Sequence, residues 1–167
     1  NNIDLEECGK QGILVTNTPD VLTDATADVA MILILMTMRR VPESMEFLKE
    51  GKFNGWKPDL LLGADLKGKT LGILGMGRIG QAVARRAEGF GMKIQYHSKS
   101  GSKPGLGYPS VGFDHLLATS DVLSLHVPLL PETRHLLGKQ ELLKMKKGAV
   151  LVNTARGPIV DEAALAE

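Results

Sequence analysis

One glycine-rich segment constrains the fold of this 167-residue chain more tightly than any other feature. The motif is G-x-G-x-x-G, with its glycines at Gly75, Gly77 and Gly80. It follows the apolar run Leu71–Leu74 directly, and a segment with helical spacing, Gly77–Phe90, begins inside it. In this context the pattern predicts a dinucleotide site. The first glycine permits a tight turn, the second lets a pyrophosphate approach the backbone, and the third lets the helix pack close to the strand.

Apolar strands alternate with helices along the chain. Besides the first run, strands are expected at residues 13–17, 92–97, 121–126 and 148–153. Such alternation is typical of βαβ units, in which a parallel sheet is covered by helices on both faces. We therefore predict an α/β fold, a Rossmann-type doubly wound parallel sheet of five strands. A chain of this length without an obvious linker is expected to form one domain.

A long helix is expected at Ala25–Arg40, capped by Thr23 and Asp24, with a second helix at Pro42–Glu50. The long helix is apolar on nearly every face, so we expect it to be buried on all sides or covered by a second subunit or domain. The longest unbroken apolar run, Val29–Met36, is far shorter than the roughly 18 residues that a membrane span needs. No membrane association is expected.

Composition excludes several other classes. The net charge of +1 and an aromatic content of 4% argue against nucleic acid as a partner. A polar, acidic N-terminal stretch does not resemble a signal peptide. Cys8 is the only cysteine, which suits a reducing, cytoplasmic compartment, and we expect it to be a small buried residue. None of His97, His115 and His135 has a partner at metal-ligand spacing, so no metal site is predicted.

The segment after the second strand of the predicted βαβ unit bears on cofactor choice. NAD sites usually place Asp or Glu there to hold the ribose 2′-hydroxyl, but this chain has Ser98, Lys99 and Ser100 instead. Lysines and hydroxyls offer donors to a 2′-phosphate, so we favour NADP, with NAD as the alternative. A solvated basic loop without a cofactor role is the other interpretation. At the helix start, Arg78 offers a further charge-assisted contact to phosphate.

Two later strands end in polar residues at the edge where ligands bind in open α/β sheets. Arg156 lies in a loop of small residues, where its guanidinium can clamp a substrate carboxylate with two parallel hydrogen bonds. The alternative is a surface arginine paired with Asp161 or Glu162. His126 is a candidate acid or base, although a hydrogen bond to backbone is the favoured interpretation.

Together these segments closely resemble the NAD(P)-binding domain of the D-isomer-specific 2-hydroxyacid dehydrogenases, and most of all the glyoxylate/hydroxypyruvate reductases. The resemblance covers essentially the whole chain, through motifs that keep their order. These are Asn2–Asp4, Val15–Pro19, Thr23–Asp28, Gly75–Gly80, His126–Thr133 and Asn153–Asp161.

The resemblance implies roles for individual residues. The pyrophosphate would be held by Gly77, Arg78, Ile79 and Gly80, and the adenosine ribose and its phosphate would face Ser98, Lys99 and Ser100. Near the cofactor would lie Pro128 and Thr133. The nicotinamide would be lined by Thr154, Ala155 and Arg156. Arg156 would be the substrate-orienting arginine, and Thr26 would contact the cofactor from the long helix. That helix and the loop around Trp56 would contribute to a homodimer.

The sequence also departs from the family pattern. The family's catalytic His and its partner Glu lie downstream of the arginine, and its substrate domain is missing from this chain. The chain begins at Asn1 without a Met and ends inside an expected helix, 161–167. We therefore expect residues 1–167 to be a partial dinucleotide-binding domain, truncated at the C-terminal end of its sheet.

The parent enzyme would be an NAD(P)-dependent oxidoreductase that reduces 2-keto acids to D-2-hydroxy acids. One alternative is a dinucleotide-binding, dimerising fragment without catalysis of its own. Another is a different family member, such as a phosphoglycerate, phosphite or formate dehydrogenase, or a co-repressor.

Overall fold

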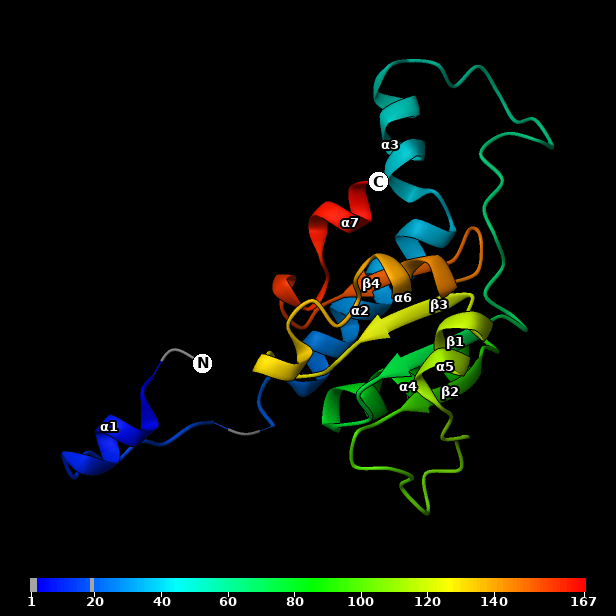
Figure 1. Cartoon of the computed structure of the whole chain (residues 1–167). Coiled ribbons are helices and arrows are strands. Elements are labelled where there is room, and N and C mark those ends of the chain that lie inside the picture. The colour runs from blue at the N-terminus through cyan, green and yellow to red at the C-terminus, as the bar shows by residue number, and fades with distance from the viewer. Residues whose placement is uncertain (1–2, 19) are drawn as a thin grey trace.

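The sheet has four parallel strands in the order β2-β1-β3-β4 (Figure 1). The computed structural model describes residues 3–18 and 20–167. The strands are β1 (Thr70–Leu74), β2 (Lys93–His97), β3 (Val122–Leu125) and β4 (Val150–Asn153). In the register, Leu74 lies beside both His97 and Leu125, and Leu125 lies beside Asn153. The segments that follow the four strands therefore meet at one edge of the sheet.

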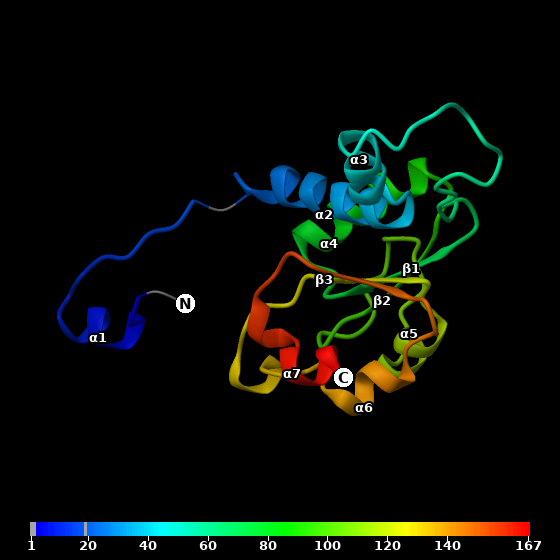
Figure 2. The same ribbon diagram turned by 90° about the horizontal axis from the view of Figure 1, so that it is seen from above.

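Helices cover both faces of this sheet. The helices of the described residues are α1 (Leu5–Lys10), α2 (Thr23–Met38), α3 (Val41–Lys49), α4 (Arg78–Gly89), α5 (Phe113–Thr119), α6 (Lys139–Lys144) and α7 (Glu162–Ala166), with short 3-10 turns η1 (Pro131–Thr133) and η2 (Gly157–Ile159). In Figure 2, α2 and α4 lie on one side of the strands and α5 and α6 on the other. The Rossmann-type doubly wound parallel sheet is thus confirmed, and no helix among the described residues is long and apolar enough to cross a membrane.

Each face of the sheet has its own apolar core. Leu71 and Ile73 of β1 are fully buried in the core beneath α2 and α4, whereas Leu123 and Leu125 of β3 are buried in the core beneath α5. Side chains of a strand alternate between faces, so one short strand supplies both cores. The alternation explains why β3 and β4 are apolar at all but one position each.

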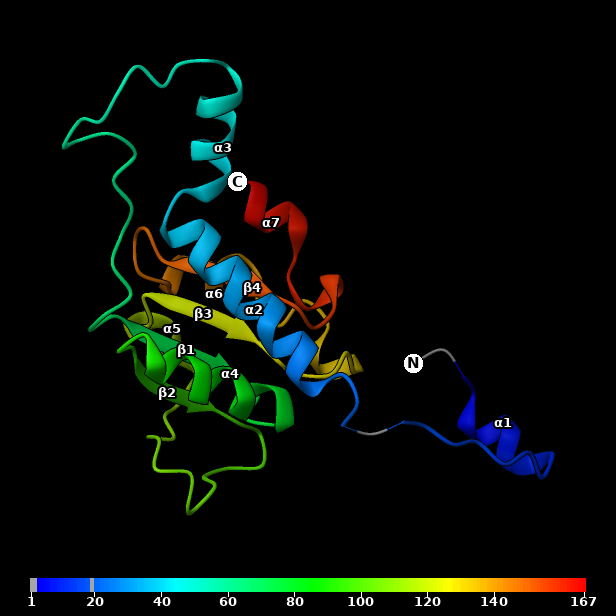
Figure 3. The same ribbon diagram turned by 180° about the vertical axis from the view of Figure 1, so that it is seen from behind.

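The prediction of a strand before the long helix is wrong. Residues 13–17 form no strand, and Ile13 and Leu14 are 54% and 88% exposed. Together with α1, this segment extends away from the sheet (Figures 1 and 3). Within the described residues no strand lies beside it to pair its backbone, so its β-forming side chains are not sufficient. Cys8, in α1, is half-buried rather than buried, while Pro19, the last residue of the Val15–Pro19 motif, lies outside the described residues.

Of the two alternatives predicted for the long helix, burial on all sides and a cover from a second subunit or domain, the structure excludes the first. Ala27, Ala30 and Ile34 of α2 are fully buried, whereas Val29 and Ile32 are about half exposed. Burial on all sides within this chain is therefore excluded, and one apolar face of α2 remains open. The side chains expected to cap the helix do not: its N-cap is Leu22, without a side-chain hydrogen bond.

Phe90, the last residue of the segment with predicted helical spacing, is 45% exposed. The helix α4 ends at Gly89 and Phe90 is its C-cap, so the helical spacing that would turn this ring toward the core stops one residue earlier. Asp24, the other expected cap of α2, pairs instead with Arg86 of α4 at 2.9 Å. This ion pair joins α2 to α4 on the surface.

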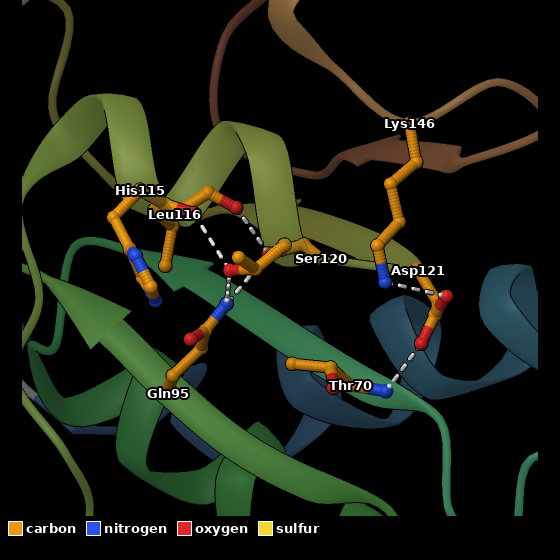
Figure 4. Close-up of polar contacts among 8 residues, drawn as sticks. Thr70, Gln95, His115, Leu116, Ser120, Asp121 and Lys146 are labelled. Atoms are coloured by element: carbon orange, nitrogen blue, oxygen red, sulfur yellow. Dashed lines mark hydrogen bonds and ion pairs between the residues drawn. The ribbon is translucent and has the colours of Figure 1, made fainter.

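At the amino-terminal end of the sheet the polar groups are satisfied within the chain (Figure 4). The Asp121 carboxylate accepts hydrogen bonds from the Thr70 amide at 2.8 Å and from the Lys146 ammonium at 3.0 Å. Nearby, the buried Gln95 amide donates to Ser120 Oγ at 3.2 Å. These contacts tie β1 and β2 to the segments that surround β3.

Candidate functional site

A cleft of three adjoining cavities runs along the carboxyl ends of the strands. Their volumes are about 430, 460 and 610 Å³, and His126 and Pro128 line all three. The cavities bring together most of the predicted site residues: Thr26, Gly75, Gly77, Arg78, Ile79, Ser98, Lys99, Ser100, Pro128, Thr154, Ala155 and Arg156. The predicted residues Gly80 and Thr133 do not line them.

The glycine turn forms the floor of the cleft. Gly75 has a φ of +98°, which L side chains rarely adopt, and a Cβ there would lie 2.7 Å from the His126 carbonyl oxygen. A Cβ at Gly80 would collide with the Gly75 carbonyl oxygen, so Gly80 acts from behind the cleft by allowing α4 to approach β1. Both glycines are required by packing.

Gly77 differs from its two neighbours. Nothing lies within 4 Å of a Cβ built at this position, although the residue lines two of the cavities. Gly77 is also the N-cap of α4 and provides no side-chain cap. The first amides of α4 are therefore left for a ligand, and a helix start of this kind favours phosphate.

Arg78 at the start of α4 is held by an acid on the rim of the cleft. Its guanidinium lies 3.0 Å from the Asp20 carboxylate, and both side chains are exposed. The two residues line the same cavity as Gly77. A diphosphate entering this cavity would compete with Asp20 for the guanidinium.

The loop after β2 forms the end of the cleft beyond the glycine turn. Ser98 Oγ and Ser100 Oγ lie 2.9 Å apart, and Lys99 Nζ lies 2.9 Å from a Glu132 carboxylate oxygen. The Tyr96 hydroxyl, inside the core, accepts a hydrogen bond of 2.7 Å from the Lys103 amide. This bond fixes the loop to the sheet and keeps its polar side chains at the cavity.

At the other end of the cleft, the loop after β4 carries an unsatisfied hydroxyl. Thr154 Oγ1 is buried and has no hydrogen-bond partner among the described residues. The loop itself is fixed by Asn153, whose amide donates to the Arg156 carbonyl at 2.9 Å and whose Oδ1 accepts from the Ala155 amide at 3.0 Å. The sequence analysis assigned no role to Asn153; its place at the end of the strand and before the small residues was the available signal.

Arg156 extends from this loop with an exposed side chain. Its Nη1 donates to the Ala155 carbonyl at 2.7 Å, and the described residues supply no carboxylate partner. The two acids considered as partners are placed elsewhere: Asp161 caps α7, and Glu162 lies in the first turn of that helix. The guanidinium is therefore available at the cleft.

His126 does not make the expected side-chain bond to backbone. Its Nε2 instead lies 2.8 Å from Ser124 Oγ, two residues back along β3. Burial lowers the pKa of His126 to about 4, so the ring is neutral at physiological pH. Thr133 supports the cleft wall from outside, because its hydroxyl donates a hydrogen bond to the Pro128 carbonyl at 2.7 Å, and its place near the cofactor stays a prediction.

A parallel sheet with an uncapped helix start after β1 and an open cleft at its carboxyl edge is the arrangement of a dinucleotide-binding domain. The chain matches the family model described as D-isomer specific 2-hydroxyacid dehydrogenase, NAD binding domain, over residues 31–167. The chain therefore belongs to this family.

Individual relatives agree with this assignment. A glyoxylate reductase from Thermococcus litoralis is 54% identical over 172 residues, which cover 99% of this chain and 52% of that protein. A crystal structure of a protein from Thermus thermophilus has a TM-score of 0.94 and 52% identity, covering 98% of this chain and 52% of that one. A D-lactate dehydrogenase from Aquifex aeolicus, solved with NAD and lactic acid, has a TM-score of 0.88 and 37% identity, covering 98% and 49%. The chain thus spans about half the length of the relatives it matches.

Proposed function

We propose that the chain is the larger part of the NADP-binding domain of an enzyme that reduces glyoxylate, hydroxypyruvate or a similar 2-keto acid to the D-2-hydroxy acid. The observation that carries the proposal is the preformed cleft, in which Gly77 faces open space beside uncapped amides. The Thr154 hydroxyl at the other end of the cleft, which has no hydrogen-bond partner among the described residues, fits a polar ligand that can form a hydrogen bond with it. The names of the related glyoxylate reductases support the substrate class.

Residues of this chain would bind the cofactor along its length. The start of α4 at Gly77 and Arg78 would hold the diphosphate, and Thr154 and Ala155 would border the nicotinamide. At the adenosine end, Ser98, Lys99 and Ser100 offer donors where an acid would repel a 2′-phosphate. When bound, the cofactor supplies the hydride for the carbonyl carbon of the substrate.

Arg156 would orient the substrate. Its planar guanidinium can hold a carboxylate with two parallel hydrogen bonds, and it stands beside Thr154 and Ala155 at the same cavity. The positive charge would also polarise the neighbouring keto oxygen while hydride arrives. We propose that the group that supplies the proton belongs to a part of the enzyme outside this chain.

A homodimer in the cytoplasm completes the proposal. The open face of α2 carries Val29, Ile32 and Leu33, and Trp56, in the loop between α3 and β1, is 82% exposed. Apolar side chains gathered in this way favour contact with another subunit. The single cysteine suits a reducing compartment.

The test is a titration of the purified chain with NADPH and with NADH, followed by addition of glyoxylate or hydroxypyruvate. We expect saturable binding of NADPH, weaker binding of NADH, and no turnover. Turnover by the chain alone would contradict the assignment of catalytic groups to other parts of the enzyme. Failure of both nucleotides to bind to the folded chain would contradict the proposal as a whole.

A further inference from the structure

The centre of the cleft contains a serine–histidine pair that the proposed function leaves unused. Ser124 is fully buried in β3, and its Oγ lies 2.8 Å from Nε2 of His126, which follows the strand. Residues two apart on a strand project to the same side, which brings the two side chains together. The His126 backbone also packs directly against Gly75, so the residue lies beside the glycine turn.

The hydroxyl determines which ring nitrogen carries the proton. A buried hydroxyl proton needs an acceptor, and within the described part of the chain Nε2 is the only partner of Ser124 Oγ. Ser124 therefore donates and Nε2 accepts. Because the ring is neutral, its single proton must reside on Nδ1.

This Nδ1–H is a donor without a partner in the described residues. The only buried side-chain polar atom that lacks a partner there is Thr154 Oγ1, so Nδ1 is not sealed inside the protein. His126 lines all three cavities, so the cleft is where a partner can reach its ring. The donor is thus fixed in one tautomer before any ligand arrives.

We infer that His126 binds the dinucleotide by donating a hydrogen bond from Nδ1 to an oxygen of its diphosphate–ribose portion. Ser124 is then a positioning residue that fixes the tautomer and the ring orientation. His126 lies between the cavity lined by Ser98–Ser100 and the cavity at Arg156, so its ring would contact the middle of the bound dinucleotide. The inference rests on the proposed dinucleotide binding and adds to it a residue outside the glycine motif.

The first measurement needs no ligand. Long-range ¹H–¹⁵N NMR correlations of the imidazole distinguish the two neutral tautomers, and we expect the Nδ1–H form in the wild-type chain. In Ser124→Ala, whose fold is checked by backbone amide spectra, we expect a mixture of tautomers. A wild-type ring in the Nε2–H form would overturn the role of Ser124.

The second measurement is NADPH affinity, by fluorescence titration. His126→Leu removes the donor, and we expect a loss of about tenfold, which is the scale of one hydrogen bond in a cleft. His126→Asn places an amide N–H close to the position of Nδ1, and we expect affinity within about threefold of wild type. Ser124→Ala should fall between the two.

The outcomes separate this inference from the proposed function. If wild type binds NADPH and His126→Leu binds it equally well, the inference fails while the proposed function stands. If His126→Asn is as weak as His126→Leu, the donor role is wrong. If wild type binds neither NADPH nor NADH, the proposed function and the inference fail together, whereas the tautomer spectrum still reports on Ser124.

Discussion

The two ends of the parallel sheet are built from the same four strands but differ in how their polar groups are satisfied. At the amino end, the Asp121 carboxylate accepts from the Thr70 amide and from Lys146, so both of its oxygens have partners (Figure 4). At the carboxyl end, Thr154 Oγ1 is buried without a partner among the described residues, and the first amides of α4 have no side-chain cap.

This difference separates stability from binding. A buried polar group without a partner costs free energy, so a chain retains one where a ligand completes the bonding. Mutations at the amino end of the sheet should therefore lower the stability of the fold, and mutations at the carboxyl end should lower the affinity for the ligand. The predictions below test this division, from the largest expected effect to the smallest.

Gly80→Ala should give the largest effect and should act on stability although the residue belongs to the glycine motif. Its Cβ would collide with a backbone carbonyl, so α4 must move away from β1. We expect a loss of about 3 kcal/mol in the free energy of unfolding, the upper range for overpacking. Urea denaturation measures it; an unchanged midpoint would show that the helix can shift without cost.

Arg156→Lys, made in the longer enzyme, keeps the charge but loses the planar fork. We expect a loss of about 2–3 kcal/mol in transition-state binding, or roughly 30–150-fold in kcat/KM for the 2-keto acid. Stability should not change, since the Arg156 side chain is exposed. An unchanged kcat/KM would remove Arg156 from substrate orientation.

Gly77→Ala is the matched control for Gly80→Ala. Its Cβ meets nothing within 4 Å, so the fold should be as stable as wild type within about 0.5 kcal/mol. The added methyl group occupies the approach to the α4 amides, and we expect NADPH affinity to fall about 10- to 100-fold, the scale of a lost charged hydrogen bond. Calorimetric titration measures it. Equal stability losses in the two variants would contradict the division within the motif.

Asp121→Asn, at the amino end of the sheet, should lower the stability of the fold. Burial alone would raise the pKa of Asp121, but the Thr70 amide and Lys146 outweigh it and lower that pKa. The carboxylate therefore stabilises the fold at pH values above its pKa in the unfolded chain, which is about 3.9. This stabilisation is lost as the pH falls through the pKa that the group has in the folded chain. We expect the variant to be about 1.5 kcal/mol less stable at pH 7, with a smaller gap at pH 3. NADPH affinity should not change.

Thr154→Val should lower affinity less than Gly77→Ala does, and any effect on stability should have the opposite sign to that of the other variants. Removing an unpartnered buried hydroxyl should leave stability unchanged or raise it by up to about 1 kcal/mol. NADPH affinity should fall by about fivefold if the cofactor completes that hydroxyl's bonding. A destabilised variant with normal affinity would place Thr154 with the structural residues.

The sequence-based predictions were accurate for features that depend on a few neighbouring residues and less accurate for features that depend on residues far apart in the chain. The turn at Gly75 and the strand ends were predictable because apolar runs and glycines act over a few residues. Residues 13–17 have a strand-like composition, but strand formation depends on a neighbour, which the described chain does not supply. The exposure of Phe90 likewise depends on where α4 ends.

Contacts between side chains at the site were the least predictable. The bond between Ser124 and His126 connects residues close together in the chain, yet it requires the hydroxyl and the ring to be placed by the packed sheet. The ion pair between Asp20 and Arg78 joins segments far apart in the chain. Residue type indicated which groups had suitable chemistry, while the fold determined which of them remained open.

An NMR titration of the ¹⁵N-labelled chain with NADPH tests the division between the two ends most directly. We predict saturable shifts in the amides of Gly75–Gly80, Ser98–Lys103 and Thr154–Arg156, with Thr70 and Asp121 unmoved. Shifts centred on Thr70 and Asp121, or no saturable shifts in the folded chain, would contradict the account.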